Sequence, residues 1–70
     1  MKELDYRICK IIKIFTDEYD IEPTTNDIAR VIRYDYRLTR YHLKNLEDMG
    51  IVKSNKKKNK KYSLNVNNLE

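Results

Sequence analysis

The excess of lysine and arginine, whose side chains can bind phosphate groups, lies near the end of this 70-residue sequence. The sequence has 15 basic and 11 acidic side chains, which gives a formal net charge of +4. Six lysines fall within residues 50–70, where Glu70 is the only acid, and most of them form the run from Lys56 to Lys61. Such an asymmetry concentrates positive potential on one part of a small surface and favours a phosphate-rich partner. The alternative is a basic segment that is only solvated.

Side chains suited to covalent or metal chemistry are few. The sequence has one cysteine, Cys9, one histidine, His42, and two serines. Zinc requires three or four ligands, and no pair of titratable groups has the spacing of a catalytic motif. We therefore predict that the protein is not an enzyme and holds no metal or cofactor. His42 is interpreted as a packing residue and Cys9 as a small, partly buried apolar residue, with an intermolecular Cys9 disulfide as the alternative.

Length and composition predict one domain over residues 1–70. With 40% hydrophobic residues, a chain of this size can bury only one small core, and it has little core to spare for a deep ligand cavity. No small-molecule ligand is therefore expected. A lone cysteine cannot form an intrachain disulfide, and the first twenty residues are too charged for a signal peptide or a membrane span. The sequence thus predicts a cytoplasmic protein without membrane association.

Apolar residues at three- and four-residue intervals predict a first helix over about residues 2–19. The expected buried stripe consists of Leu4, Ile8, Ile11, Ile12, Phe15 and Tyr19. The expected outer face carries Lys2, Asp5, Lys10, Lys13 and Asp17. Because Pro23 disfavours helix in the residue before it, a short extended connection through Ile21 should follow.

Two start signals predict two further helices. Thr24 can accept from the backbone N–H three residues on, and Asp27 places an acid in the first turn, which predicts a helix over about residues 25–33. Asp35 is a favourable N-cap for a third helix over about residues 36–49. Gly50, the single glycine, suits the left-handed position that terminates a helix.

The apolar pattern also assigns the faces of these two helices. The shorter helix is expected to bury Ile28, Ala29, Val31 and Ile32. The inward candidates of the longer helix are Leu38, Thr39, Leu43, Leu46 and Met49. Its outward candidates are Tyr36, Arg37, Arg40, Tyr41 and Lys44.

Two short strands complete the prediction. Residues 51–54 and 60–64 are expected to form two short strands around a polar turn from Asn55 to Asn59, which predicts a hairpin with a lysine-rich tip and a short tail over residues 65–70. The predicted fold class is mainly α with a small β-hairpin, in the order helix, helix, helix, hairpin.

Two stretches of this sequence resemble the winged helix-turn-helix transcription regulators, in particular the MarR-type and ArsR-type repressors. The stretches are Thr24-x-x-Asp27-Ile28-Ala29 and His42-Leu43-x-x-Leu46-Glu47-x-Met49-Gly50-Ile51-Val52. The resemblance covers about residues 22–64. It implies three helices followed by a two-stranded wing, with the third helix as the recognition helix.

Two positions depart from the family pattern. The family often has glycine in the turn between the two motif helices, where this sequence has Arg33 or Tyr34, so we expect a turn of different length or shape. The family also tends to have valine or isoleucine at the inner position occupied here by Thr39, which affects the register expected for the third helix.

The resemblance implies a small transcriptional regulator that binds double-stranded DNA with a sequence preference. It would be located at the nucleoid or, for a viral protein, in the host cytoplasm. The recognition helix would enter the major groove, with Arg37 and Arg40 as readers of bases and Lys44 as a phosphate contact. Tyr36 and Tyr41 flank these residues on the same expected face. The lysines expected to contact phosphates from the wing are Lys56, Lys57, Lys58, Lys60 and Lys61.

The alternative interpretation of the arginines is a solvated helix face on which they form ion pairs with neighbouring residues of the same helix. Candidate pairs are Asp35 with Arg37, and Lys44 with Glu47 or Asp48.

One recognition helix reads only a few base pairs, so we also expect a homodimer on a two-fold site. The expected dimer surface is the first helix, where Tyr6, Ile14 and Tyr19 lie off the main stripe. The alternative function is a winged-helix module that docks on a protein in a transcription or replication assembly. DNA binding requires Arg37, Arg40 and the wing lysines on one face, whereas docking requires a contiguous apolar patch.

Overall fold

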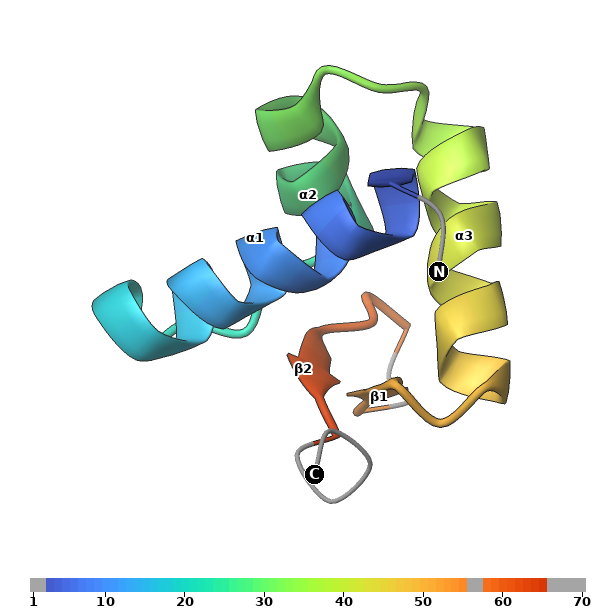
Figure 1. Ribbon diagram of the computed structural model, residues 1–70. Helices are drawn as coiled ribbons and strands as arrows, with labels where there is room; N and C mark the ends of the chain where they lie inside the picture. Colours follow the sequence, from blue (N-terminus) through green and yellow to red (C-terminus); the bar gives the residue numbers. More distant parts are fainter. Residues whose placement is uncertain (1–2, 56–57, 66–70) are drawn as a thin grey trace.

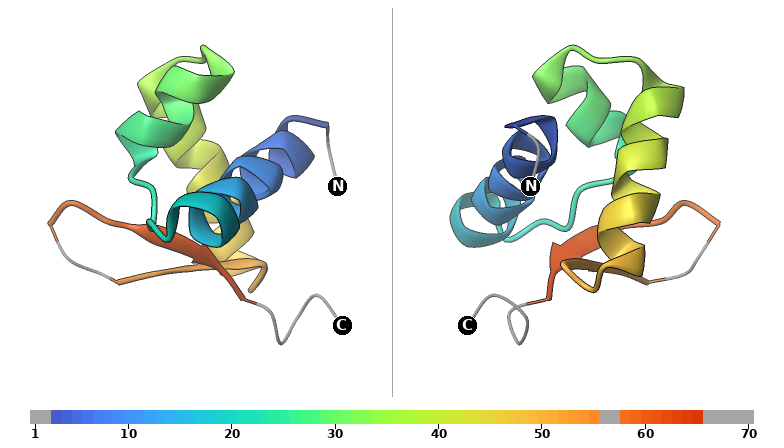
Figure 2. Two further views of the ribbon diagram at one scale, coloured as in Figure 1. Left: turned by 90° about the vertical axis from the view of Figure 1, so that its left-hand side faces the viewer. Right: turned by 45° about the vertical axis from the view of Figure 1, so that its right-hand side comes forward.

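Three helices and a two-stranded antiparallel sheet form the structure, a computed structural model that describes residues 3–55 and 58–65 (Figure 1). The elements are α1 (Glu3–Tyr19), α2 (Thr25–Ile32), α3 (Tyr36–Asp48), β1 (Val52–Ser54) and β2 (Tyr62–Leu64). The sheet lies at the end of α3 and beside α1. Figure 2 shows the described part of the loop between β1 and β2 reaching out past α3, on the side opposite to α1. This order confirms the predicted fold class.

One apolar cluster holds all five elements together. Each element contributes at least one residue that is almost completely removed from water, because none of them could bury its apolar face alone. The cluster consists of Ile8, Ile12, Ile28, Leu43, Leu46, Val52 and Tyr62.

The apolar stripe of α1 is buried in its middle but not at its end. Ile8 and Ile12 are fully buried, as predicted. The prediction for Tyr19 was wrong: this residue is exposed, because the last turn of α1 extends past its neighbours (Figure 1). The prediction for Asp5 was also wrong, since only 8% of this residue is exposed. Asp5 lies three residues before Ile8, at the edge of the buried stripe, where His42 of α3 bonds to it.

The predicted caps start both later helices. A capping box begins α2: Thr24 Oγ1 accepts from the backbone N–H of Asp27 at 3.2 Å, and the Asp27 carboxylate accepts from the backbone N–H of Thr24 at 3.0 Å. At α3, Asp35 Oδ1 accepts from the backbone N–H of Leu38 at 3.1 Å. These bonds satisfy backbone donors that the first helical turns would otherwise leave without partners.

Left-handed residues end both helices. Gly50 has φ 77°, as its position after α3 predicts. Arg33 ends α2 with φ 55° and ψ 50°, so an arginine adopts here the conformation that glycine adopts most easily. The family's glycine is therefore missing at this turn, but the left-handed backbone is present.

The buried faces of α2 and α3 are narrower than predicted. In α2 the buried side follows Thr25, Ile28, Ala29 and Ile32 at helical spacing, and Val31 falls outside it and is exposed.

In α3 the inward prediction was right for Thr39, Leu43 and Leu46 and wrong for Leu38 and Met49, which are 47% and 57% exposed. Leu38 is turned by about 100° from Thr39, and Met49 follows the last helical residue. The buried Thr39 hydroxyl donates to the backbone carbonyl of Asp35 at 2.8 Å.

The hairpin is anchored to the start of α2. Its strands pair Val52 with Leu64 and Ser54 with Tyr62. The backbone N–H of Tyr62 donates to the Pro23 carbonyl at 2.8 Å, and Thr24 forms an isolated bridge with Lys61. The extended connection predicted before α2 thus lies against the second strand. Of the predicted turn, residues 56 and 57 lie outside the described residues.

Candidate nucleic-acid interface

The outward face of α3 is the first part of the candidate site. All five side chains predicted to face outward are exposed: Tyr36, Arg37, Arg40, Tyr41 and Lys44. Their exposure follows from the burial of Thr39, Leu43 and Leu46 on the opposite side, since one helix face is committed to the core. Exposure confirms the predicted orientation.

Arg37, Arg40 and Lys44 form no ion pair with any residue in the described ranges. The pairs within α3 that would have neutralised them are not formed. Glu47 is engaged elsewhere: it accepts from the Ser54 hydroxyl at 2.7 Å, and its other carboxylate oxygen lies 4.0 Å from Lys60 Nζ. Glu47 therefore bonds to the hairpin and does not pair with the cations of α3.

The hairpin supplies the second part of the candidate site. Lys58, Lys60 and Lys61 are exposed, as their predicted role requires. Lys56 and Lys57, predicted to have the same role, lie outside the described residues.

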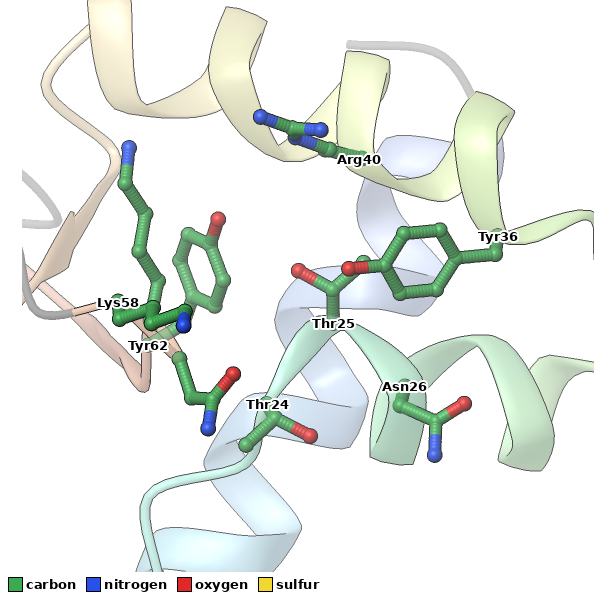
Figure 3. A pocket seen from close by; sticks show the side chains of 9 residues that line it. Thr24, Thr25, Asn26, Tyr36, Arg40, Lys58 and Tyr62 are labelled. Atoms are coloured by element: carbon green, nitrogen blue, oxygen red, sulfur yellow. The ribbon is translucent and has the colours of Figure 1, made fainter.

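Two clefts join the hairpin to α3, and both are lined by Arg40, Lys60 and Tyr62. The helix-start cleft, about 430 Å³ in volume, lies between the start of α2, α3 and the hairpin (Figure 3). Its lining includes Thr25, Tyr36 and Lys58 and contains no acidic side chain. The helix-end cleft, about 470 Å³, is also lined by Arg37 and Lys44, and by the acids Glu47 and Asp48. The predicted residues of α3 and the described wing lysines at 58 and 60 therefore meet on one surface.

Behind this surface, a buried polar pair connects α3 to α1. His42 Nδ1 lies 2.9 Å from Asp5 Oδ1, and both side chains are mostly buried. The rings of Tyr34 and Tyr41 approach the imidazole edge-on, with centroids at 6.3 and 5.8 Å. The packing role predicted for His42 is confirmed. Its partner was missed, because the three-residue spacing from Asp5 to Ile8 signals only that Asp5 lies near the buried stripe.

Cys9 packs against the core and is partly buried, as predicted. Burial raises the pKa of the Cys9 thiol, and the nearby Asp5 carboxylate raises it further. The thiolate, which is the form that reacts, is therefore disfavoured, which argues against the disulfide alternative.

Within residues 3–55 and 58–65, no three or more His, Cys, Asp or Glu side chains are grouped to hold a metal ion. Over the same ranges, no helix combines the length and the apolar character that crossing a membrane requires.

The arrangement of three helices and a following hairpin defines a winged helix-turn-helix protein. The structure is similar to a crystal structure of a mutant of MepR from a multidrug-resistant S. aureus clinical isolate, with a TM-score of 0.67 and 17% sequence identity. The likeness covers 99% of this chain and 54% of that one, so this chain spans about half the length of the MepR chain. No family model matches the sequence, and no curated protein matches it significantly. The likeness confirms the predicted winged helix-turn-helix fold.

Proposed function

We propose that this protein is a transcriptional regulator of the MarR or ArsR type that binds double-stranded DNA with a sequence preference. The observation that carries the proposal is the meeting of α3 and the hairpin at one basic surface. Arg40 and Lys60 line both clefts, Lys58 joins them in the helix-start cleft, and Arg37 and Lys44 in the helix-end cleft. All of these cations except Lys60 form no ion pair with any described residue, and such exposed cations are the electrostatic footprint of a phosphate-rich ligand.

In this proposal α3 enters the major groove and the hairpin lies along the DNA backbone. Arg37 reads base edges, because its planar guanidinium matches the two acceptors of guanine. Lys44 contacts a phosphate from α3, and the wing lysines do so from the hairpin: Lys56, Lys57, Lys58, Lys60 and Lys61. Tyr36 and Tyr41 flank the arginines on the exposed face. Bound to DNA in the cytoplasm, the protein would act by occupying its site or by recruitment, without chemistry.

Useful specificity would require two copies on a two-fold site, since a single recognition helix reads few base pairs. The surface we propose for pairing is α1, where Tyr6, Ile14 and Tyr19 are exposed apolar side chains. Sedimentation at high protein concentration, with and without duplex, tests this proposal. A monomer under both conditions would exclude the dimer.

The first test of DNA binding is fluorescence anisotropy with a mixed-sequence duplex over a range of salt concentrations, followed by selection from a random pool. A slope of log K against log salt of about −4 to −6 is expected from the cations that would neutralise phosphates. Recovery of a short palindrome would support a dimeric regulator. The absence of binding at low salt would contradict the proposal.

The second candidate function is docking on a protein partner. The observation that favours it is the exposure of three apolar side chains: Val31 on α2, Tyr34 in the turn after α2, and Leu38 on α3. Substituting Val31 and Leu38 with serine should then abolish partner binding and leave any DNA affinity unchanged. The uncompensated cations at the two clefts favour DNA.

A further inference from the structure

Two buried side chains at the helix-start cleft have hydroxyl groups that bond to none of the described residues. Thr25 and Tyr62 are only 6% and 3% exposed, and neither hydroxyl bonds to any residue that the structure describes. No fully enclosed polar side-chain atom in the described ranges lacks a partner, so both hydroxyls are reached from the cleft that they line. Figure 3 shows both pointing into it. Both hydroxyls are therefore free to donate to an acceptor that enters the cleft from outside the chain.

The charges around these hydroxyls specify what kind of acceptor fits. Arg40 and Lys58 line the cleft and form no ion pair with any described residue, whereas Lys60 lies 4.0 Å from Glu47. The acid at the start of α2, Asp27, is bonded to the backbone N–H of Thr24 and does not line the cleft. Hydroxyl donors and unpaired cations without a competing carboxylate suit an anion with several acceptor oxygens.

Backbone contacts tie together the two elements that carry these hydroxyls. Thr25 is the first residue of α2 and Tyr62 the first of β2. The hydrogen bond from the Tyr62 N–H to the Pro23 carbonyl and the bridge between Thr24 and Lys61 tie these two elements together. The backbone of both residues is therefore in place before a ligand arrives, which reduces the entropy lost on binding.

We propose that the helix-start cleft is a binding site for one phosphate group, to which Thr25 and Tyr62 donate hydrogen bonds and Arg40 supplies positive charge. The inference rests on the proposed function for the source of this group, a phosphodiester of the duplex. Arg40 is then a phosphate contact and not the base reader that the sequence predicts. It fixes the position of α3 in the groove, and base reading is left to Arg37.

The first arm of the test measures duplex affinity. Tyr62→Phe and Thr25→Val each remove one hydroxyl and keep the shape of the side chain. Each should weaken binding about tenfold for every sequence, since a hydrogen bond to a charged group is lost. The salt slope should stay unchanged in both variants, whereas Arg40→Ala should reduce its magnitude by about 1. Tyr34→Phe and Thr16→Val are the matched controls, and thermal unfolding verifies that all variants are folded.

The second arm follows backbone amide chemical shifts during titration with inorganic phosphate, against sodium chloride at equal ionic strength. Saturable shifts at Thr25 and Tyr62 that Tyr62→Phe abolishes would support the site. If these shifts appear while the hydroxyl variants bind duplex normally, the source is free phosphate. If the wild type binds no duplex, the proposed function fails and this second arm alone decides the site. Normal duplex binding by both hydroxyl variants, without specific phosphate shifts, overturns the site and leaves DNA binding intact.

Discussion

The charged and polar side chains on the two sides of α3 differ in burial and in pairing. On the side facing α1, Asp5 and His42 are mostly buried and paired at 2.9 Å. On the side facing the hairpin, Arg37, Arg40 and Lys44 are exposed and have no ion pair with any described residue. A buried charge must be paired, because desolvation is costly, but an exposed cation can remain available to a partner. The buried pair therefore holds α3 against α1, and the three exposed cations remain available to bind a partner.

The largest expected effect concerns the buried pair. His42→Leu leaves the Asp5 carboxylate buried without its partner and should lower the free energy of unfolding by about 2–3 kcal/mol. Urea denaturation measures this loss. In the folded protein, the salt slope of DNA binding should stay the same. Adding Asp5→Leu to this variant should recover most of the stability, because an apolar pair replaces the polar one. A double variant as unstable as the single one would show that the pairing is not what His42 contributes.

Arg37→Ala should have the next largest effect, and it should act on binding. We expect a loss of about 2 kcal/mol for the preferred duplex and a much smaller loss for a scrambled one, because a base contact is removed. Anisotropy with both duplexes gives the two values. Arg7→Ala is the control: this arginine lies on α1, outside the proposed interface, and its Nη2 is 3.8 Å from Glu3 Oε1. Equal losses on both duplexes would make Arg37 a phosphate contact.

A single wing lysine should contribute less. Lys58→Ala should weaken binding about threefold for all sequences and reduce the magnitude of the salt slope by about 0.9. The same measurement on Lys10→Ala, an exposed lysine of α1, should show no change. If both variants lost affinity equally, the protein's net charge and not the hairpin surface would explain binding.

The smallest expected effect is a gain of stability outside both regions. Arg33 has φ 55°, and Arg33→Gly should raise the free energy of unfolding by about 0.5 kcal/mol, since glycine adopts this conformation without strain but loses more entropy on folding. Arg30→Gly, in the last turn of α2, should lower stability by up to about 1 kcal/mol instead. Thermal unfolding distinguishes the two signs. A lower melting temperature for Arg33→Gly would show that its side chain, and not its backbone, matters at this turn.

Local chemistry made much of the fold predictable. Thr24 and Asp35 cap helices with hydroxyl and carboxylate groups that are only a few residues from their donors. Gly50 follows α3 with a left-handed backbone conformation that glycine itself adopts easily. The outward face of α3 was also predictable, because the helical period relates it to the buried Leu43 and Leu46.

Predictions failed at the edges and ends of the elements. Leu38, Val31 and Tyr19 have apolar side chains near the expected stripes, yet all three are exposed. Hydrophobic period alone does not state how wide a buried face is or where a neighbouring helix stops covering it. The prediction for Asp5 failed in the opposite direction: it was expected to be exposed but is buried, beside a histidine 37 residues away in the sequence.

The sequence by itself determined the order of the elements, their caps, the outward face of α3 and the lysine-rich segment that follows it. These features depend on residues within one or two helical turns of each other. Only the tertiary structure brought Thr25, Arg40 and Tyr62 to one cleft and paired Asp5 with His42. Both arrangements join elements far apart in the sequence, and they depend on how all five elements share one core.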